Sequence, residues 1–200
     1  MQNLDTVKRG TTDIPVEEIF LRRWSPRAFA KQAVADRDLQ AVFSAGGWAA
    51  SCFNEQPWRF LVGRNGDSAW KRILEALVAS NQAWASAAPV LYASFAKRTF
   101  TLNNQPNRVA QHDVGAASAQ IALQATALGL YVHGMVGFDP EKLRSAFQVP
   151  DDFDSVACWA LGYRGEPDEL QERLKQREIE PRQRKPLSDW VFSEWGKPAL

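Results

Sequence analysis

The segment after Asp113 constrains the fold most, because it predicts a helix that is apolar on most of its sides. Asp113 is expected to cap this helix and Gly129 to end it. One face carries apolar residues at helical spacing: Val114, Ala117, Ile121, Ala122, Ala125 and Leu128. Further alanines cover much of another face, so we expect the helix to be buried. Its small side chains would let a second helix approach closely, which indicates a central helix or one that faces a second subunit.

Helical and extended patterns alternate along the rest of the chain. We expect helices at 13–23, from about 36 to 47, from 68 to about 84, from 140, and around 167–175. Strands are predicted at 58–63, 90–95, 130–138 and 155–163. Interspersed helices and strands predict a layered fold of the α/β or α+β class. The polar loop at 97–108 is long enough to be a lid or a binding edge.

The length of 200 residues, with no internal repeat and no linker, predicts one domain over residues 1–200. Residues 1–12 are polar and expected to be loose. Residues 178–200 are expected to form an extended arm, too polar for the core but with large apolar residues: Leu187, Trp190, Val191, Phe192 and Trp195. The large apolar side chains of such an arm are expected to pack against another surface, and a partner subunit would offer one. Eight tryptophans also favour a homodimer, since tryptophan is enriched at interfaces.

Charge and cysteine usage exclude several classes of function. The net charge of +1 gives no general attraction to nucleic acid or membranes, and no apolar run is long enough to cross a bilayer. Cys52 and Cys158 lack metal-site spacing, and with no N-terminal apolar signal segment they favour a reducing cytoplasm. The two histidines, His112 and His133, form neither H-x-x-H nor H-E-x-x-H, so we expect no His/Cys metal site.

Residues 48–60, WAASCFNEQPWRF, form a polar loop between a predicted helix and a predicted strand. A loop rich in Ser, Asn and Gln, held by Pro57 and two tryptophans, can present backbone N–H groups and amides to a flat polar ligand. An ordinary connection explains the same composition, and composition alone favours it.

Arginines gather in two regions of the sequence. Arg23 and Arg27 flank Ser25 near the start, and Arg182 and Arg184 lie in the tail. Guanidinium groups offer fork-like pairs of donors that suit phosphate, and Ser25 adds a hydroxyl. The spacing fits an anion site, although a solvated charge run explains the tail arginines as well.

Covalent catalysis is not expected from the sequence. Ser25, Ser51 and Cys52 have no histidine beside them, and no G-x-S-x-G occurs. His112 is more simply a structural group at a helix start. There is no P-loop and no G-x-G-x-x-G, which argues against a Rossmann domain. The glycines in 134–138 would let the backbone approach a ligand closely, or they would only form a bend.

Several segments, taken in order, resemble the FMN-dependent nitroreductase family. Residues 23–29, RWSPRAF, resemble its R-x-S-x-R-x-F opening, and residues 50–60 are similar to its P-S-x-x-N-x-Q-P-W-x-F loop. The stretch from His112 to Gly115, the MVGFD sequence at 135–139 and the RKPL sequence at 184–187 are similar to its later motifs. Each match is modest alone, but the ordered set covers nearly the whole chain and is specific.

The resemblance implies an α+β fold of three layers, an α/β/α sandwich around a mixed, mainly antiparallel sheet. It implies an intertwined homodimer that exchanges its C-terminal arms and holds FMN at the interface. NADH or NADPH would give a hydride to FMN, and an electron-poor small molecule such as a nitroaromatic or a quinone would then take the electrons in a ping-pong reaction. Flavin N5 would carry the chemistry, with no catalytic side chain. A dehalogenase, an enone reductase, a flavin-cleaving enzyme or a non-catalytic flavin-binding protein of the same fold stays open.

The resemblance also implies particular contacts to FMN. Arg23 and Ser25 would hold its phosphate and ribityl end, with help from the tail arginines. Arg27 would lie near flavin N1 and O2, where a fixed cation raises the reduction potential. Residues 50–56 would approach the ring from the other subunit. The implied contacts are Arg23, Trp24, Ser25, Arg27, Ala50, Ser51, Cys52, Asn54, Gln56, Asn81, Met135, Val136, Gly137, Arg182 and Arg184.

Three residues depart from the family pattern. Trp24 replaces a residue that is often small or basic, and Ala50 replaces a frequent proline. Trp84 lies where some relatives carry a basic side chain near the flavin. Together with the 97–108 loop, these departures leave the choice of electron acceptor open.

Overall fold

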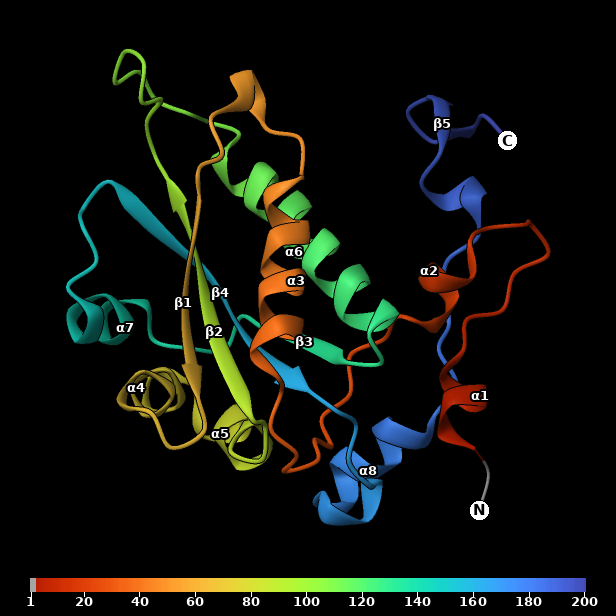
Figure 1. Ribbon diagram of the computed structural model, residues 1–200. Helices are drawn as coiled ribbons and strands as arrows, with labels where there is room; N and C mark the ends of the chain where they lie inside the picture. The colour runs from red at the N-terminus through yellow and green to blue at the C-terminus, as the bar shows by residue number, and fades with distance from the viewer. Residues whose placement is uncertain (1–2) are drawn as a thin grey trace.

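A four-stranded sheet of order β1-β2-β4-β3 separates two layers of helices (Figure 1). The structure is a computed structural model, and it describes residues 3–200. The strands are β1 (Trp58–Arg64), β2 (Val90–Lys97), β3 (Tyr131–Met135) and β4 (Phe153–Gly162). The predicted strands are therefore confirmed, except that the third ends at Met135 instead of continuing to 138. The architecture confirms the expected α+β class and its three layers.

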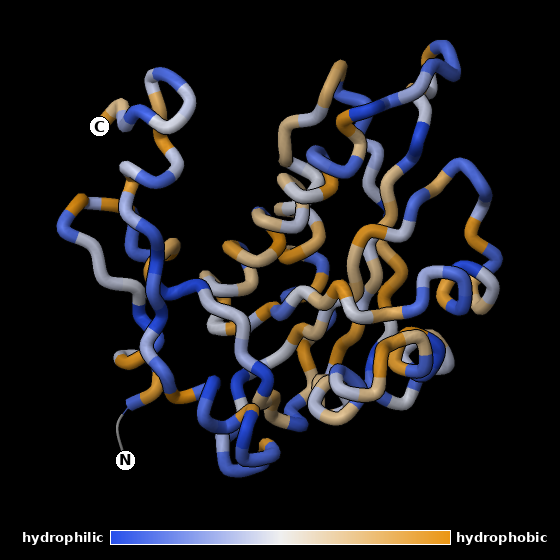
Figure 2. The backbone as a smooth tube through the Cα atoms, turned by 180° about the vertical axis from the view of Figure 1, so that it is seen from behind, coloured by the Kyte–Doolittle hydropathy of each residue, from blue (hydrophilic) through white to orange (hydrophobic). Residues whose placement is uncertain are grey.

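All pairings in this sheet are antiparallel. Within residues 3–200 the sheet thus lacks the parallel component of the mixed sheet that the family resemblance implied. The central strand β2 is buried on both faces. Tyr92 faces one helical layer, and Leu91 and Ala93 face the other. Figure 2 shows the same arrangement as apolar strands inside a largely hydrophilic periphery.

The first layer consists of α3 (Asp36–Gly47) and α6 (Ala110–Ala127). The two helices approach closely because Gly46 has no side chain: a Cβ there would lie 2.7 Å from Cγ1 of Ile121. The expectation of a buried Ala-rich helix is confirmed, since Ala117, Ile121 and Ala125 are fully buried. Its predicted start is wrong: Asp113 lies inside the first turn, and its carboxylate accepts from the N–H of Cys52 instead of capping the helix.

The second layer consists of α4 (Ser68–Ala76), α5 (Ala79–Ala85) and α7 (Pro140–Phe147). One continuous helix was expected from 68 to about 84, and this prediction is wrong. The chain is extended at Leu77 and Val78 because both pair with the segment after β3. Leu77 forms an antiparallel bridge with Phe138, and the N–H of Val78 donates to the carbonyl of Gly137 at 3.0 Å.

The N-terminal segment is not loose throughout. Residues Leu4–Lys8 form α1, capped by the side chain of Asn3, and Lys8 is buried against the end of α8 (Glu172–Ile179). The expected looseness is therefore wrong for residues 4–8, while residues 1–2 lie outside the described part of the chain. The helix expected at 13–23 is limited to α2 (Glu18–Arg22), and that expected at 167–175 is divided between η2 (Pro167–Glu169) and α8.

The C-terminal arm begins after Ile179, slightly later than the expected residue 178. It contains η3 (Leu187–Asp189) and a short hairpin of β5 (Phe192–Glu194) and β6 (Lys197–Pro198). In Figure 1 the arm rises beside α2 and away from the sheet. Trp195 is 97% exposed, so this large apolar side chain has almost no cover within the chain.

Among residues 3–200, no helix has the length and apolarity needed to cross a membrane.

Substitution of Gly63 tests the packing of β1 on α4. A Cβ at this position would meet the backbone N of Trp70 at 2.1 Å, and backbone cannot move aside cheaply. We expect Gly63→Ala to lower the free energy of unfolding by about 3 kcal/mol, measured by urea denaturation at fixed protein concentration. The neighbouring Val62→Ala, in a half-exposed position, is the control and should cost less than about 1 kcal/mol. Equal effects of the two substitutions would contradict the close packing.

Candidate functional site

A cluster of cations forms where the segment between α2 and α3 meets the C-terminal arm. Nη1 of Arg23 donates to Oγ of Ser25 at 3.3 Å. The guanidinium of Arg182 donates to three backbone carbonyls, those of Lys8, Leu21 and Arg23. The fold thus brings Arg23 together with the tail arginines Arg182 and Arg184.

The cluster has an excess of positive charge. Burial and the neighbouring Arg184 lower the pKa of Arg23. Burial, Arg23 and Arg184 lower the pKa of Arg182 to about 10. Within residues 3–200, no carboxylate lies within 4.0 Å of Arg23, Arg27, Arg182 or Arg184 as an ion-pair partner. An anion bound here would reduce the repulsion among these groups.

Glu178 fixes the backbone at Arg27. Its carboxylate is 1% exposed, and Oε1 accepts from the N–H groups of Arg27 at 2.8 Å and of Ala28 at 3.0 Å. Burial lowers the pKa of Arg27, whereas Glu178 raises it. Sequence reasoning did not identify Glu178. Its position four residues after Leu174, which packs on the core, was the available signal for an inward-facing carboxylate.

His133 lies beneath the same segment and was also missed. Its Nδ1 is 2.8 Å from the carbonyl oxygen of Pro26, which can only accept, so Nδ1 carries the hydrogen. Its ring contacts Trp84, with 4.6 Å between the ring centroids. Burial lowers the pKa of His133 to about 4, and the nearby Arg27 and Arg23 act in the same direction. His133 is therefore neutral near pH 7.

Asn81 and Gly137, both predicted contacts, touch each other. Nδ2 of Asn81 donates to the carbonyl of Gly137 at 3.0 Å, so the amide is held against the backbone that follows β3. Val136 is 86% exposed, whereas the side chain of Met135 is buried in the core. The N–H groups of Val136 and Gly137 donate to no backbone acceptor in the part of the chain that the structure describes. These two N–H groups can therefore donate hydrogen bonds to a ligand.

Trp24 and Trp84 both point inward. Trp24 packs edge-to-face on Tyr131 at 5.8 Å, with Nζ of Lys8 lying 5.1 Å from its ring centroid. Trp84 is buried between Phe29 and His133. A ligand contact from Trp24 would have to come from its backbone. The aromatic side chain of Trp84 fills the interior.

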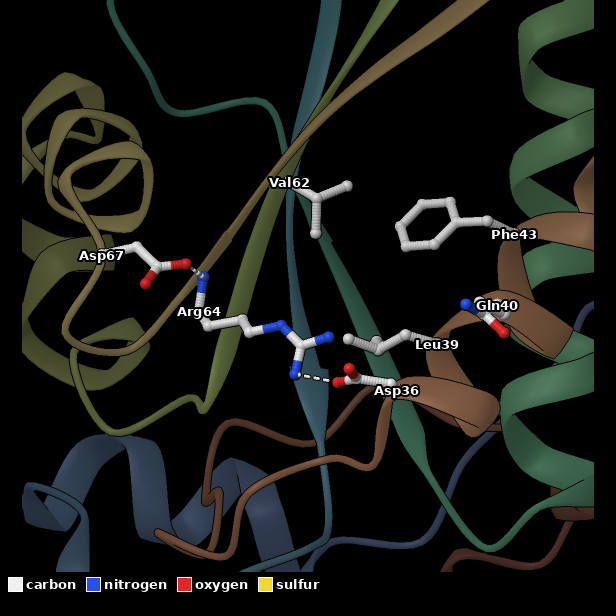
Figure 3. Close-up of a pocket in the computed structure, with 7 residues that line it drawn as sticks. All are labelled: Asp36, Leu39, Gln40, Phe43, Val62, Arg64 and Asp67. Atoms are coloured by element: carbon white, nitrogen blue, oxygen red, sulfur yellow. Dashed lines mark hydrogen bonds and ion pairs between the residues drawn. The ribbon is translucent and has the colours of Figure 1, made fainter.

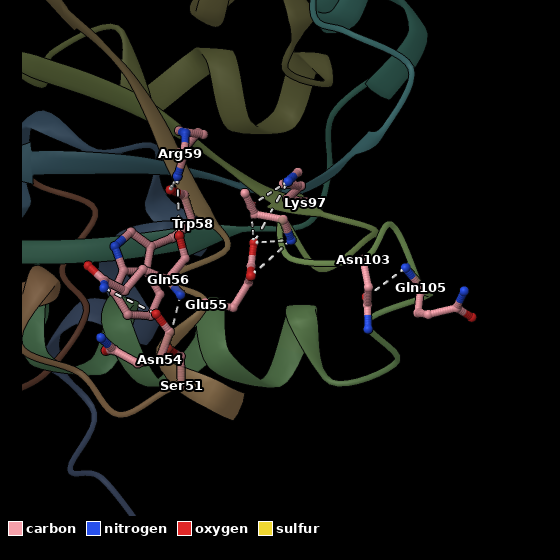
Figure 4. Close-up of polar contacts among 10 residues, drawn as sticks. Ser51, Asn54, Glu55, Gln56, Trp58, Arg59, Lys97, Asn103 and Gln105 are labelled. Carbon is pink, nitrogen blue, oxygen red and sulfur yellow. Dashed lines mark hydrogen bonds and ion pairs between the residues drawn. The ribbon is translucent and has the colours of Figure 1, made fainter.

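The 50–56 loop is held by its own polar groups (Figure 4). The N–H of Gln56 donates to Oγ of Ser51 at 3.0 Å, and Nε2 of Gln56 donates to the carbonyl of Asn54 at 3.2 Å. From α6, Asp113 accepts from the N–H of Cys52 at 3.0 Å. Ala50, Asn54 and Gln56 are exposed, and Ser51 and Cys52 are half-buried. The side chains that could meet a ligand are thus mostly on the surface.

This loop and the arginine cluster lie at opposite ends of α3. In Figure 1, η1 (Cys52–Asn54) is at the top of the molecule, and α3 descends from it toward the segment that joins α2 to α3. The 12 residues of α3 give a separation of about 18 Å along the helix. One chain therefore divides the predicted site residues into two groups.

A hollow of about 380 Å³ lies elsewhere. It lies between α3 and the outer edge of β1, and Figure 3 shows Val62, Leu39 and Phe43 around it. Arg64 reaches across to Asp36, with an ion pair of 2.6 Å. None of the predicted site residues lines this hollow.

Comparisons with known proteins agree with the geometry. The model of the Nitroreductase family matches residues 21–163. An uncharacterized 15.4 kDa protein from Mycolicibacterium smegmatis is 35% identical over 148 residues, covering 70% of this chain and 99% of that protein. An NADH dehydrogenase of Thermus thermophilus is 30% identical over 185 residues, covering 77% of this chain and 89% of that protein. A solved structure described as an oxidoreductase containing FMN has a TM-score of 0.88 and 33% identity, covering 96% of this chain and 97% of that one.

The pKa of His133 leads to a prediction about stability. The unfolded chain binds a proton at His133 as the pH falls through 6.5, whereas the folded chain does so only near 4. The contribution of neutral His133 to stability is therefore present above pH 6.5 and is lost between pH 6.5 and 4. We expect His133→Asn to lose less unfolding free energy over this interval than the unsubstituted protein, measured by urea denaturation. Parallel losses in the two proteins would contradict the lowered pKa.

Proposed function

Since the chain belongs to the nitroreductase family, we propose that it is an FMN-dependent oxidoreductase. It takes hydride from NADH or NADPH and passes electrons to an electron-poor small molecule, such as a nitroaromatic or a quinone, in a ping-pong reaction. The observation that carries this proposal is the clustering of Arg23, Arg182 and Arg184, with the hydroxyl of Ser25 in contact with Arg23. The names of the similar proteins, an FMN-containing oxidoreductase and an NADH dehydrogenase, agree with it.

The donor set fits the phosphate of FMN. Arg23 and Ser25 are already in hydrogen-bond contact, and Arg184 is close enough to lower the pKa of Arg23. A phosphate monoester would neutralise this excess charge and accept several of its donors. Arg182 uses its own donors to hold the backbone in place, so its part is chiefly to position Arg23 and to supply charge.

The backbone after β3 fits the ring of FMN. Val136 and Gly137 offer N–H groups without backbone acceptors in the described chain, and Asn81 fixes the turn that presents them. Arg27, whose backbone Glu178 anchors, would place a cation where negative charge develops on reduction. When bound, FMN supplies the hydride-accepting atom N5, and the protein supplies binding, orientation and tuning.

The division of the site residues supports a homodimer. If Ser51, Asn54 and Gln56 contact FMN, they serve the site of a second copy, because α3 separates them from Arg27 within one chain. The exposed apolar residues of the arm support an exchange of arms between the copies. The free edge of β1 and the hollow beside it, lined by Val62 and Phe43, offer a place for such an arm (Figure 3).

A first test is spectroscopic. Purified protein is expected to be yellow and to bleach when NADH or NADPH is added anaerobically. Bound FMN that neither nicotinamide reduces would instead favour a non-catalytic flavin-binding protein of the same fold. Colourless protein that free FMN does not reconstitute would contradict every flavin-based function. A survey of acceptors at fixed NAD(P)H would then separate quinone and nitroaromatic reduction from dehalogenation, enone reduction and flavin cleavage.

A second test uses two variants in one dimer. Arg27→Ala is expected to weaken FMN binding at least about tenfold, because it removes a charged contact, and to lower the reduction potential of the flavin. Asn54→Ala should also weaken FMN binding. In a freely exchanged 1:1 mixture, one site of each mixed dimer contains neither substitution, so about a quarter of all sites should regain full affinity. FMN titration by fluorescence quenching measures this recovery. A mixture that binds FMN no better than its components would contradict a site shared between subunits.

A further inference from the structure

Three residues of the 50–56 loop have left-handed backbone conformations. They are Phe53, Asn54 and Gln56, with φ of 52°, 55° and 52°. None is glycine, and such conformations persist in other residues only when the surroundings hold them. Strain of this kind concentrates where a side chain or a backbone group must be presented in one direction.

Glu55 provides the contact that ties this loop to a second one. Both of its carboxylate oxygens accept from the N–H of Thr101 at 3.0 Å, and Oε1 also accepts from Oγ1 of Thr101 at 2.6 Å (Figure 4). Nζ of Lys97 donates to Oγ1 of Thr101 at 2.6 Å and lies 3.7 Å from Oε1 of Glu55. The Glu55 side chain is only 9% exposed, so solvent competes weakly for these contacts.

The second loop is braced internally. Its two arms meet at a bridge between Thr99 and Pro106. The N–H of Phe100 donates to the carbonyl of Gln105 at 2.9 Å, and the N–H of Asn104 donates to the carbonyl of Phe100 at 2.9 Å. The loop at 98–107 can therefore be moved or held as one body, and Glu55 holds it.

The contacts of Glu55 with Thr101 and Lys97, here called the clasp, join the two loops. They bring two phenylalanines together. Phe53 and Phe100 pack edge-to-face with 5.8 Å between their ring centroids. Phe53 remains 91% exposed, so this contact covers little of its ring. An aromatic pair that keeps a ring face open is suited to bind a third flat aromatic molecule by stacking.

We propose that Glu55 is a positioning residue that fixes Phe53 and Phe100 as one apolar wall beside the flavin, and that this wall selects planar aromatic electron acceptors. The inference rests on the proposed function, because Phe53 stands beside Asn54, which that function places in contact with FMN. The wall would add stacking area for a flat acceptor. A compact inorganic oxidant, which reacts without stacking, gains nothing from it.

The experiment follows the oxidative half-reaction of the FMN-loaded protein. The cofactor is reduced photochemically, so NAD(P)H takes no part, and its oxidation by a naphthoquinone and by ferricyanide is measured in stopped flow. Phe53→Ala and Phe100→Ala are expected to raise the half-saturating naphthoquinone concentration about fivefold or more, which reflects lost stacking. The rate with ferricyanide should stay within about twofold, since no stacking contact is involved.

Variants of the clasp separate positioning from general damage. Glu55→Gln and Thr101→Val should raise the half-saturating naphthoquinone concentration in the same way, while Thr101→Ser, which keeps the hydroxyl, should restore it. Amide hydrogen exchange across 98–107 should become faster in Glu55→Gln and Thr101→Val but not in Thr101→Ser. Glu75→Gln, which changes an exposed carboxylate on α4, is the matched control and should change neither quantity.

Each failure has its own signature. Failure of the proposed function is seen in the unsubstituted protein, as an inability to bind FMN or to be reduced by nicotinamide. The inference is overturned in FMN-loaded protein if Phe53→Ala and Phe100→Ala leave naphthoquinone saturation unchanged, or if ferricyanide is affected equally. Unchanged hydrogen exchange in Glu55→Gln would overturn the role of Glu55.

Discussion

From Arg23 to Ala28 the chain forms no helix or strand, so charged side chains make the hydrogen bonds of the backbone in this segment and at the end of α2. Arg182 donates to the carbonyls of Leu21 and Arg23, and Glu178 accepts from the N–H groups of Arg27 and Ala28. Buried charges are costly unless they are hydrogen-bonded. Here the hydrogen bonds of Arg182 and Glu178 also fix the position of the cation cluster. The exposed surface of the site thus depends on a buried set of polar contacts between the two ends of the chain.

The strands were predictable from the sequence because their apolar runs are bounded by turn residues, as at 90–97. The residues proposed to bind the cofactor followed only as a set, from the order of short motifs, and their contacts to FMN stay predictions. The break between α4 and α5 was not predictable from the sequence. Val78 is extended because it pairs with Gly137, which is far away in the sequence. Lys8 and Glu178 were missed because a polar side chain predicts exposure. Helical spacing from Leu174 indicates that Glu178 faces inward, and the tertiary contacts show that both side chains are buried.

The role expected for Trp84 from the sequence differs from its position in the fold. Its position in the family pattern suggested an influence on the acceptor pocket. In the fold, its ring instead occupies the interior between Phe29 and His133, with His133 bonded to the carbonyl of Pro26. An aromatic side chain here supports the arginine segment from below. The neutral state of His133 suits this location, since a further charge would lie close to Arg23 and Arg27.

The position of α3 between the two groups of site residues has a thermodynamic consequence. If a complete site needs both ends of α3 from different copies, cofactor binding and self-association are linked equilibria. FMN would then tighten the dimer by the same factor by which dimer formation tightens FMN binding. The retention of the cofactor would depend on protein concentration, and dilution alone would release it. In such a dimer the cofactor would be part of the quaternary structure.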